Sequence, residues 1–132
     1  MAKDLRLLII EDNEALFDLY DMVLANSFDI DTAETCAQGI EKFLENPNVY
    51  DAVITDLHHQ GKNGVDVVEA VYNSSNPRIP VYVVTGGSDE ETMERARKLV
   101  VSRYIEKPFS FTELGSQVLR DAKQIKREKL KY

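Results

Sequence analysis

The sequence has a single cysteine, no long apolar run and no excess of basic charge, and each absence excludes a class of protein. Cys36 has no second cysteine to pair with, so an internal disulfide framework is excluded and we expect a reducing, cytoplasmic compartment. We interpret Cys36 as a small core or surface residue of a helix. No apolar stretch approaches the roughly 18 residues that a membrane-spanning helix needs, and the first residues show no signal-peptide pattern. We therefore expect no membrane contact.

Negative charge dominates the chain, but its distribution is uneven. Residues 120–132 hold six basic and two acidic residues, a net charge of +4, whereas the other 119 residues hold 10 basic and 21 acidic residues, a net charge of −11. An acidic body disfavours contact with phosphate backbones, so we expect no direct nucleic-acid binding by this domain. The basic stretch fits the solvated end of a helix, where positive charge complements the helix dipole. A contact with nucleic acid at that end is the alternative.

Apolar runs and amphipathic stretches alternate five times along the 132 residues, with no internal repeat or linker. The length and the 43% hydrophobic content predict a single domain over 1–132, with a core at about 4–125 and a basic helix end at 120–132. We expect strands at 5–10, 30–33, 51–55, 79–84 and 102–106. We expect helices at 14–26, 35–46, 65–72, 88–99 and 110–125, the last of which frays over 126–129.

Strands that alternate with helices through short connections form a parallel sheet covered on both faces. For five strands, the common arrangement is the flavodoxin-like (βα)5 doubly wound sheet of the α/β class, with strand order 2-1-3-4-5. Ligands of such sheets bind outside the carboxyl ends of the strands. The residues that directly follow the predicted strands are therefore the candidate site.

The predicted strands are followed by polar residues: Glu11 and Asp12 after the first, Asp56 after the third, Thr85 after the fourth and Lys107 after the fifth. Crowded carboxylates repel one another unless they are protonated or share a cation, and oxygen ligands favour Mg²⁺. Asp56 is suited to be a nucleophile, since a carboxylate can form an acyl phosphate. Mg²⁺, Lys107 and Thr85 would share the charge of the phosphoryl group. The pattern predicts a magnesium-dependent site for phosphoryl transfer.

Each of these residues also has a purely structural interpretation. Asp12 could cap the first helix, Thr85 could simply end a strand, and Lys107-Pro108 could form an ordinary turn. Taken singly, these interpretations are the better ones. Because suitable residues follow four strands at once, we favour the phosphoryl site.

Five segments of the chain are typical of one family: 7–13 (LLIIEDN), 53–57 (VITDL), 63–64 (NG), 83–86 (VVTG) and 104–109 (YIEKPF). Because of these segments, the sequence resembles the receiver domain of two-component response regulators over about residues 4–125. The resemblance implies that Asp56 accepts a phosphoryl group from a phosphohistidine on a sensor histidine kinase or a histidine phosphotransfer protein. It implies a signalling role and no enzymatic turnover, apart from self-phosphorylation and slow hydrolysis of the acyl phosphate.

The resemblance also implies roles around the acceptor. Glu11 and Asp12 match the acid pair that holds Mg²⁺ together with Asp56. His58 matches the position that lends the metal its backbone carbonyl. Lys107 matches the lysine that pairs with the phosphoryl group. The family places a cis peptide after this lysine, so the Lys107–Pro108 bond is a candidate.

Thr85 and Tyr104 match the switch pair of the family. By the resemblance, the hydroxyl group moves toward the phosphoryl group and the aromatic ring turns inward. The face made by the fourth helix, the fifth strand and the fifth helix then changes its affinity for partners. The same face could form a homodimer.

The loop after the acceptor departs from the family pattern. Gln60 stands where the family usually has a proline, and His59 and Lys62 stand where it has apolar residues. His58 and His59 fit exposed loop residues better than a transition-metal site or a phosphohistidine, because no cysteine or further histidine accompanies them.

Three alternative functions stay open on sequence grounds. A haloacid-dehalogenase-type phosphatase would need a second aspartate where His58 stands and more length for a substrate cap. A receiver-like module that binds partners without being phosphorylated has the atypical loop in its favour. An FMN-binding protein of the same fold is a weaker alternative, because Glu11 and Asp12 would repel the flavin phosphate.

Overall fold

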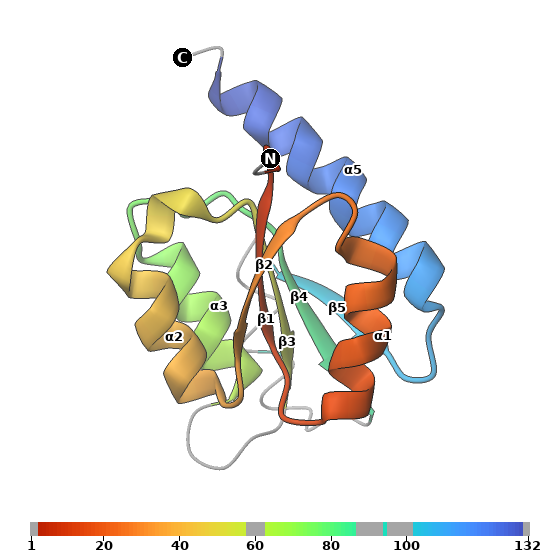
Figure 1. The fold of residues 1–132 in the computed structure, drawn as a ribbon. Coiled ribbons are helices and arrows are strands. Elements are labelled where there is room, and N and C mark those ends of the chain that lie inside the picture. Colours follow the sequence, from red (N-terminus) through yellow and green to blue (C-terminus); the bar gives the residue numbers. More distant parts are fainter. Residues whose placement is uncertain (1–2, 58–62, 87–93, 95–101, 131–132) are drawn as a thin grey trace.

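A parallel five-stranded sheet organises the protein (Figure 1). The computed structural model describes residues 3–57, 63–86, 94 and 102–130. The strands are β1 (Arg6–Ile10), β2 (Asp29–Ala33), β3 (Ala52–Asp56), β4 (Val81–Thr85) and β5 (Ser102–Glu106). They pair in parallel in the order β2-β1-β3-β4-β5, which confirms the predicted doubly wound sheet.

Helices cover both faces of the sheet. Helices α1 (Glu14–Leu24) and α5 (Phe111–Lys129) lie on one face, and α2 (Cys36–Glu45) and α3 (Gly64–Tyr72) lie on the other (Figure 1). A single turn of 3-10 helix, η1 (Pro47–Val49), follows α2 and was not predicted. The helix predicted at 88–99 lies outside the described residues, apart from Glu94, which is helical. None of the described helices is long and apolar enough to cross a membrane.

Short polar side chains begin the helices. Asn13 accepts a hydrogen bond from the Leu16 N–H at 3.1 Å, so Asn13 caps α1 and the interpretation of Asp12 as that cap is wrong. Ser110 caps α5 as predicted, because its hydroxyl accepts the Glu113 N–H at 3.1 Å. The carboxylate of Asp12 is therefore left for the candidate site.

Helix α5 continues further than its sequence pattern predicts. It ends at Lys129, so the fraying expected over 126–129 is wrong. Lys126 donates a hydrogen bond to the backbone carbonyl of Asp4. Lys129 donates one to the side chain of Asn76, which is buried. These contacts with the body of the protein hold the last turns in place, which a solvated helix end would not have.

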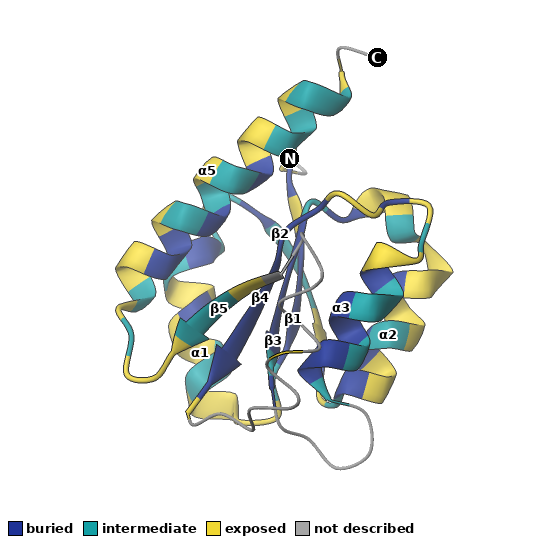
Figure 2. Cartoon of the chain, turned by 180° about the vertical axis from the view of Figure 1, so that it is seen from behind, coloured by how far each residue is buried: buried dark blue, intermediate teal, exposed yellow. Residues whose placement is uncertain are grey.

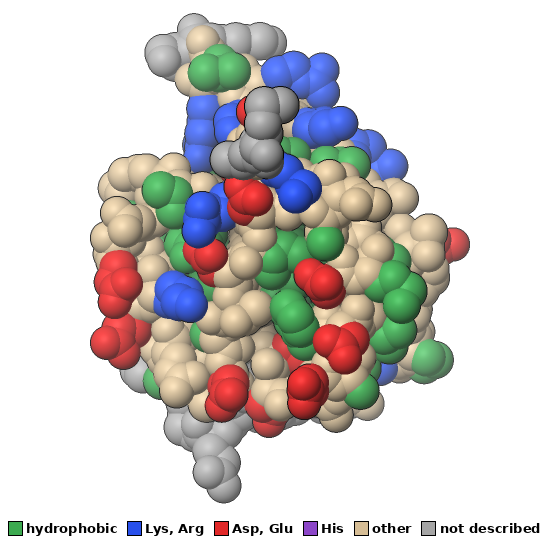
Figure 3. All heavy atoms as spheres, viewed as in Figure 1, with side chains coloured by type: hydrophobic (Ala, Val, Ile, Leu, Met, Phe, Trp, Pro, Cys, Tyr) green, Lys and Arg blue, Asp and Glu red, His purple; other side chains and the backbone are tan. Residues whose placement is uncertain are grey.

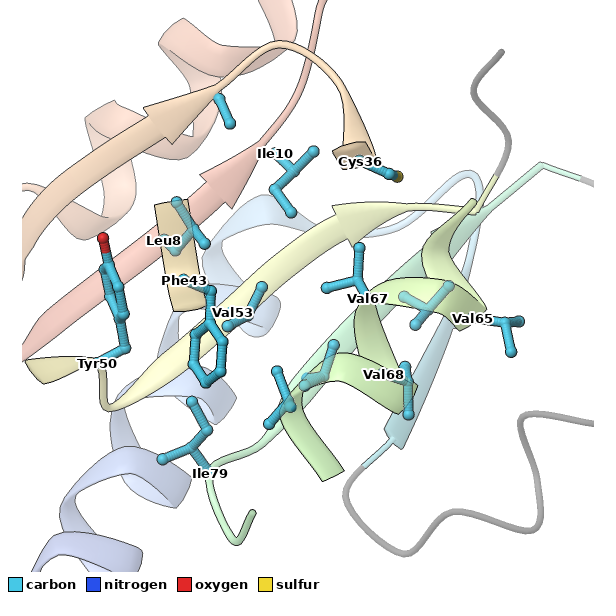
Figure 4. Close-up of a cluster of buried hydrophobic side chains, with 14 of the residues drawn as sticks. Leu8, Ile10, Cys36, Phe43, Tyr50, Val53, Val65, Val67, Val68 and Ile79 are labelled. Carbon is cyan, nitrogen blue, oxygen red and sulfur yellow. The ribbon is translucent and has the colours of Figure 1, made fainter. Parts of the chain in front are cut away.

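Two apolar cores lie on either side of the sheet. The α2–α3 core, shown in Figure 4, contains side chains of those two helices and of the strands, among them Leu8, Phe43 and Val68. The α1–α5 core contains Leu7, Tyr20 and Val118, among others. Successive residues of the central strands alternate between the cores, so these strands are buried on both faces (Figure 2). This burial makes the sheet a rigid support for whatever follows its strand ends.

Candidate functional site

The strand ends bring an aspartate and a lysine together at one edge of the sheet. Asp56 ends β3 and Lys107 directly follows β5, and their Oδ1 and Nζ atoms lie 3.4 Å apart. Thr85 ends β4, the strand between them, and its carbonyl oxygen accepts the Lys107 N–H at 2.8 Å. The Lys107–Pro108 peptide bond is cis, as the resemblance implies. Solvent reaches both charged groups, since 19% of the Asp56 side chain and 36% of the Lys107 side chain are exposed.

Two further acidic side chains, Glu11 and Asp12, follow β1 at the same edge of the sheet. Glu11 directly follows β1, and its Oε2 accepts the Asn13 N–H at 3.1 Å. Burial raises the pKa of the Glu11 carboxyl to about 7, and the negative charges of Asp56 and Asp12 add to the rise. Glu11 therefore lies within electrostatic reach of both Asp12 and Asp56. Figure 3 shows the wider pattern, with Asp and Glu side chains toward this end of the molecule and Lys and Arg side chains toward the end of α5.

The donors at this edge can be compared with the needs of Mg²⁺. Within 3–57, 63–86, 94 and 102–130, no group of three or more His, Cys, Asp or Glu side chains is arranged to hold a metal ion on its own. Mg²⁺ does not need such a group, since it keeps several waters and commonly binds through one or two carboxylates. Glu11 and Asp56 supply oxygen donors with excess negative charge, which suits this ion. The donors fit a water-rich magnesium site. The predicted carbonyl ligand, His58, lies outside the described residues.

The two predicted switch residues lie on neighbouring strands. Thr85 is 2% exposed at the end of β4. Tyr104 lies in β5 and pairs in register with Val83 of β4, two residues before Thr85. Side chains two apart on a strand share a face, so Thr85 and Tyr104 face the same side of the sheet. The Tyr104 ring is half-buried and packs against the α2–α3 core.

An apolar hollow of about 220 Å³ lies beside the ion pair. Its lining comes from α1, from the segment that joins β5 to α5 and from the first residue of α5: Leu16, Tyr20, Lys107, Pro108, Phe109 and Phe111. The rings of Tyr20 and Phe111 meet edge to face with centroids 4.9 Å apart, and those of Phe109 and Phe111 lie 4.7 Å apart. Mutual ring packing gives the hollow well-defined walls next to Lys107.

Sequence reasoning missed two residues beneath the acceptor. Cys36 is fully buried at the start of α2, and burial raises the pKa of its thiol to about 11. Its Sγ lies 3.5 Å from Thr55 Oγ1 and 3.8 Å from the carbonyl oxygen of Asp56. The sequence held one indication of a role for Thr55, namely its position directly before the acceptor. It held none for Cys36, because the contact of Cys36 joins segments far apart in the sequence.

The sequence matches a known family over most of its length. The profile of the response regulator receiver domain matches residues 7–119. Transcriptional regulatory protein KdpE of Staphylococcus aureus is 27% identical over 115 residues, which are 86% of this chain and 48% of that protein. Transcriptional regulatory protein RprY of Bacteroides fragilis is 27% identical over 132 residues, which are 99% of this chain and 55% of that protein. The chain thus spans about half the length of these curated relatives.

Solved structures share the fold. A response regulator receiver domain protein from Clostridium thermocellum has a TM-score of 0.79 at 25% identity, covering 97% of this chain and 99% of that one. A CheY-like receiver domain protein from Methanospirillum hungatei JF-1 has a TM-score of 0.82 at 20% identity, with the same coverage of 97% and 99%. Receiver domains are in general signalling modules without catalytic turnover. Sequence motifs, strand order and family profile agree, and this chain belongs to the response regulator receiver domain family of two-component signal transduction.

Proposed function

We propose that this chain accepts a phosphoryl group on Asp56 and transmits the signal by changing a surface that partners contact. The observation that carries the proposal is the distance of 3.4 Å between Lys107 Nζ and Asp56 Oδ1 at the carboxyl edge of the sheet. Glu11 and Asp12 crowd the same edge with negative charge. A nucleophilic carboxylate beside an ammonium group and further oxygen ligands is what phosphoryl transfer to a carboxylate needs.

In the proposed reaction, a carboxylate oxygen of Asp56 attacks the phosphorus atom of a phosphohistidine. The new P–O bond forms as the P–N bond breaks, and the electron pair of the P–N bond returns to the imidazole, which takes up a proton. Lys107 lies beside the transferred group and offsets its negative charge. The hydroxyl of Thr85, at the end of the adjacent strand, donates to a phosphoryl oxygen.

Glu11, Asp12 and Asp56 are the side chains that would hold Mg²⁺, with the backbone carbonyl of His58 as a further ligand. Bound magnesium supplies positive charge that polarises the phosphoryl oxygens. The raised pKa of Glu11 supports this assignment, because burial and the charges of Asp56 and Asp12 make the site favour a cation.

The proposed phosphoryl donor is a sensor histidine kinase or a histidine phosphotransfer protein, so the reaction takes place in the cytoplasm. The apolar hollow beside Lys107 supports a protein donor. An apolar side chain of the donor can enter the hollow while its phosphohistidine faces Asp56, and burial of apolar surface would stabilise the encounter.

Thr85 and Tyr104 form the proposed switch. Both residues face the same side of the sheet, and the Tyr104 ring is half-buried against the α2–α3 core. A charge-assisted hydrogen bond from Thr85 to the phosphoryl group would favour one position of the ring over another. The face that includes β5 and α5, to which the resemblance adds the helix predicted at 88–99 outside the described residues, would then change its affinity for a partner or for a second copy of the chain.

Incubation with acetyl phosphate and Mg²⁺, followed by mass spectrometry of the intact protein, tests the acceptor. We expect one phosphoryl group on the wild type and none on Asp56→Asn. Asp18→Asn, which changes an exposed carboxylate of α1, should be labelled like the wild type. Label that persists on Asp56→Asn would exclude Asp56. A wild type that takes up neither phosphoryl groups nor beryllofluoride would favour a binding module that works without phosphorylation.

A further inference from the structure

We infer that Cys36 and Thr55 are positioning residues: they form a buried hydrogen-bond chain that holds the peptide group after Asp56 and so sets the rate of acceptor phosphorylation. The inference rests on the proposed function, because it concerns how fast Asp56 reacts.

The hydrogen-bond chain ends on the backbone of the acceptor. Thr55 Oγ1 donates to the carbonyl oxygen of Asp56 at 3.1 Å. Cys36 Sγ lies 3.5 Å from Thr55 Oγ1, so the thiol can donate to the Thr55 hydroxyl while that hydroxyl donates to the Asp56 carbonyl. The same sulfur lies 3.8 Å from the Asp56 carbonyl, which gives it a second acceptor. Both side chains are fully buried, so water does not compete for these bonds.

The same peptide group is held on its other sides. The Leu57 N–H donates to the carbonyl oxygen of Val84 in β4 at 2.9 Å. Gly64, at the start of α3, approaches so closely that an added Cβ atom would lie 2.7 Å from the Asp56 carbonyl oxygen. The start of α2, the start of α3 and β4 therefore all contact one peptide unit, and Figure 4 shows Cys36 near the end of this core where the strand ends lie.

The orientation of this peptide affects the acceptor because Asp56 is the last residue of β3. The Leu57 N–H of this peptide pairs with β4, and the side chains of Thr55 and Cys36 contact its carbonyl group. Rotation about the Cα–C bond of Asp56 would move both groups and the chain that follows. The attacking oxygen must meet phosphorus within a narrow range of positions, so small rotations lower the rate of reaction. Thr55 and Cys36 constrain the carbonyl end of this peptide, in addition to the strand pairing of its N–H end.

A matched pair of variants tests the inference. Thr55→Val removes the hydroxyl at nearly constant shape, and Thr55→Ser keeps it. With acetyl phosphate and Mg²⁺ at saturation, we expect Thr55→Val to be phosphorylated about three- to tenfold more slowly than the wild type. The reason is that the variant loses one or two of the hydrogen bonds that hold the acceptor peptide. Thr55→Ser should restore most of the rate.

Cys36 provides an independent pair of variants. Cys36→Ala, which removes the donor, should also slow phosphorylation, by about two- to fivefold, and Cys36→Ser should recover part of the rate. Ile79→Val is the control for packing, because Ile79 is fully buried in the same core but lies just before the start of β4, at the end of the sheet away from the acceptor. It should lower the denaturant midpoint and leave the phosphorylation rate unchanged.

The outcomes separate this inference from the proposed function. If the wild type is labelled on Asp56 while Thr55→Val and Cys36→Ala react as fast as the wild type, the positioning role is wrong and the proposed function stands. A rate that follows the denaturant midpoint in every variant, Ile79→Val included, would also overturn it. If the wild type is not labelled at all, the proposed function fails and this inference fails with it.

Discussion

Lys107 reaches across β4 to form an ion pair with Asp56, which ends β3 on the other side of that strand. The Nζ and Oδ1 atoms lie 3.4 Å apart. The ion pair therefore connects the ends of β3 and β5, the strands on either side of β4, at the carboxyl edge of the sheet. Lys107 is also bound through its backbone, since its N–H donates to the Thr85 carbonyl. The lysine therefore contacts both the proposed acceptor and the proposed switch residue.

This double contact predicts that Lys107 couples phosphorylation to the surface change. We expect Lys107→Ala to be phosphorylated on Asp56 by acetyl phosphate, because the nucleophile and the acidic residues are intact. The chemical shifts of β5 and α5 amides should respond much less to beryllofluoride than in the wild type, and NMR spectra of both proteins measure this. Lys107→Arg is the control that keeps the charge. A full shift response in Lys107→Ala would contradict the coupling role.

Gly64 should be required for the position of the acceptor peptide. In Gly64→Ala, the new methyl group would lie 2.7 Å from the Asp56 carbonyl oxygen, and a backbone atom cannot move away cheaply. We expect the free energy of unfolding to fall by about 1–3 kcal/mol, as overpacked sites do. Urea unfolding measures it. Gly115→Ala is the control, since its methyl group would lie 3.3 Å from a movable Val23 side chain. Equal effects of both changes would contradict the close approach at Gly64.

Removing one of the crowded carboxylates should stabilise the metal-free protein. Asp12→Asn takes away a charge that raises the pKa of Glu11, so we expect a gain of up to about 1 kcal/mol in the free energy of unfolding without Mg²⁺. In the wild type, Mg²⁺ at ten times its dissociation constant should add about 1.4 kcal/mol, and this gain should be small in Asp12→Asn.

Thermal or urea unfolding with and without Mg²⁺ measures both effects. Asp18→Asn, on the exposed face of α1, controls for the general loss of one negative charge. If Mg²⁺ stabilises Asp12→Asn as much as it stabilises the wild type, Asp12 does not hold the metal.

Arg6 and Asp31 should make part of the stability depend on pH. The Arg6 guanidinium donates two hydrogen bonds to the Asp31 carboxylate, at 2.8 and 2.9 Å, and Tyr50 donates a third at 2.7 Å. Hydrogen bonding from Arg6 lowers the pKa of Asp31, and the Tyr50 hydroxyl and the Arg6 charge add to the shift. A group whose pKa is lowered by folding stabilises the protein above its unfolded pKa, which is about 3.9 for aspartate. That stabilisation is lost as the pH falls through the folded pKa.

Because the Arg6 end of the pair is exposed, we expect Asp31→Asn to cost only about 0.5–1 kcal/mol at pH 7. The difference between wild type and variant should shrink below about pH 4. Urea unfolding from pH 7 to pH 3 measures it. A difference that stays constant over this range would show that the ionised carboxylate is not what stabilises the fold.

Local rules explain most of what the sequence predicts correctly. Ser110 and Glu113 show capping spacing that needs only three residues of chain, and the cap is present. The pairing of Asp56 with Lys107 could also be expected, because parallel strands end at a common edge and the strand order follows from short right-handed connections.

Prediction was wrong where two local signals competed or where distant segments meet. Asp12 and Asn13 are both good capping residues, and only the path of the chain shows that Asn13 caps α1. The charged end of α5 has the composition of a fraying helix. It is helical because Lys126 and Lys129 bond to segments near Asp4 and Asn76, which no local pattern reveals.

The sequence by itself determined the alternation of strands and helices, the strand order and the set of residues at the strand ends. These follow from apolar periodicity and chain direction, which are local properties of the sequence. Only the tertiary structure decided what surrounds the acceptor: the Cys36 thiol beneath Asp56, the close approach of Gly64 and the raised pKa of Glu11. The physical reason is that burial and short contacts between remote residues exist only once the layers have packed.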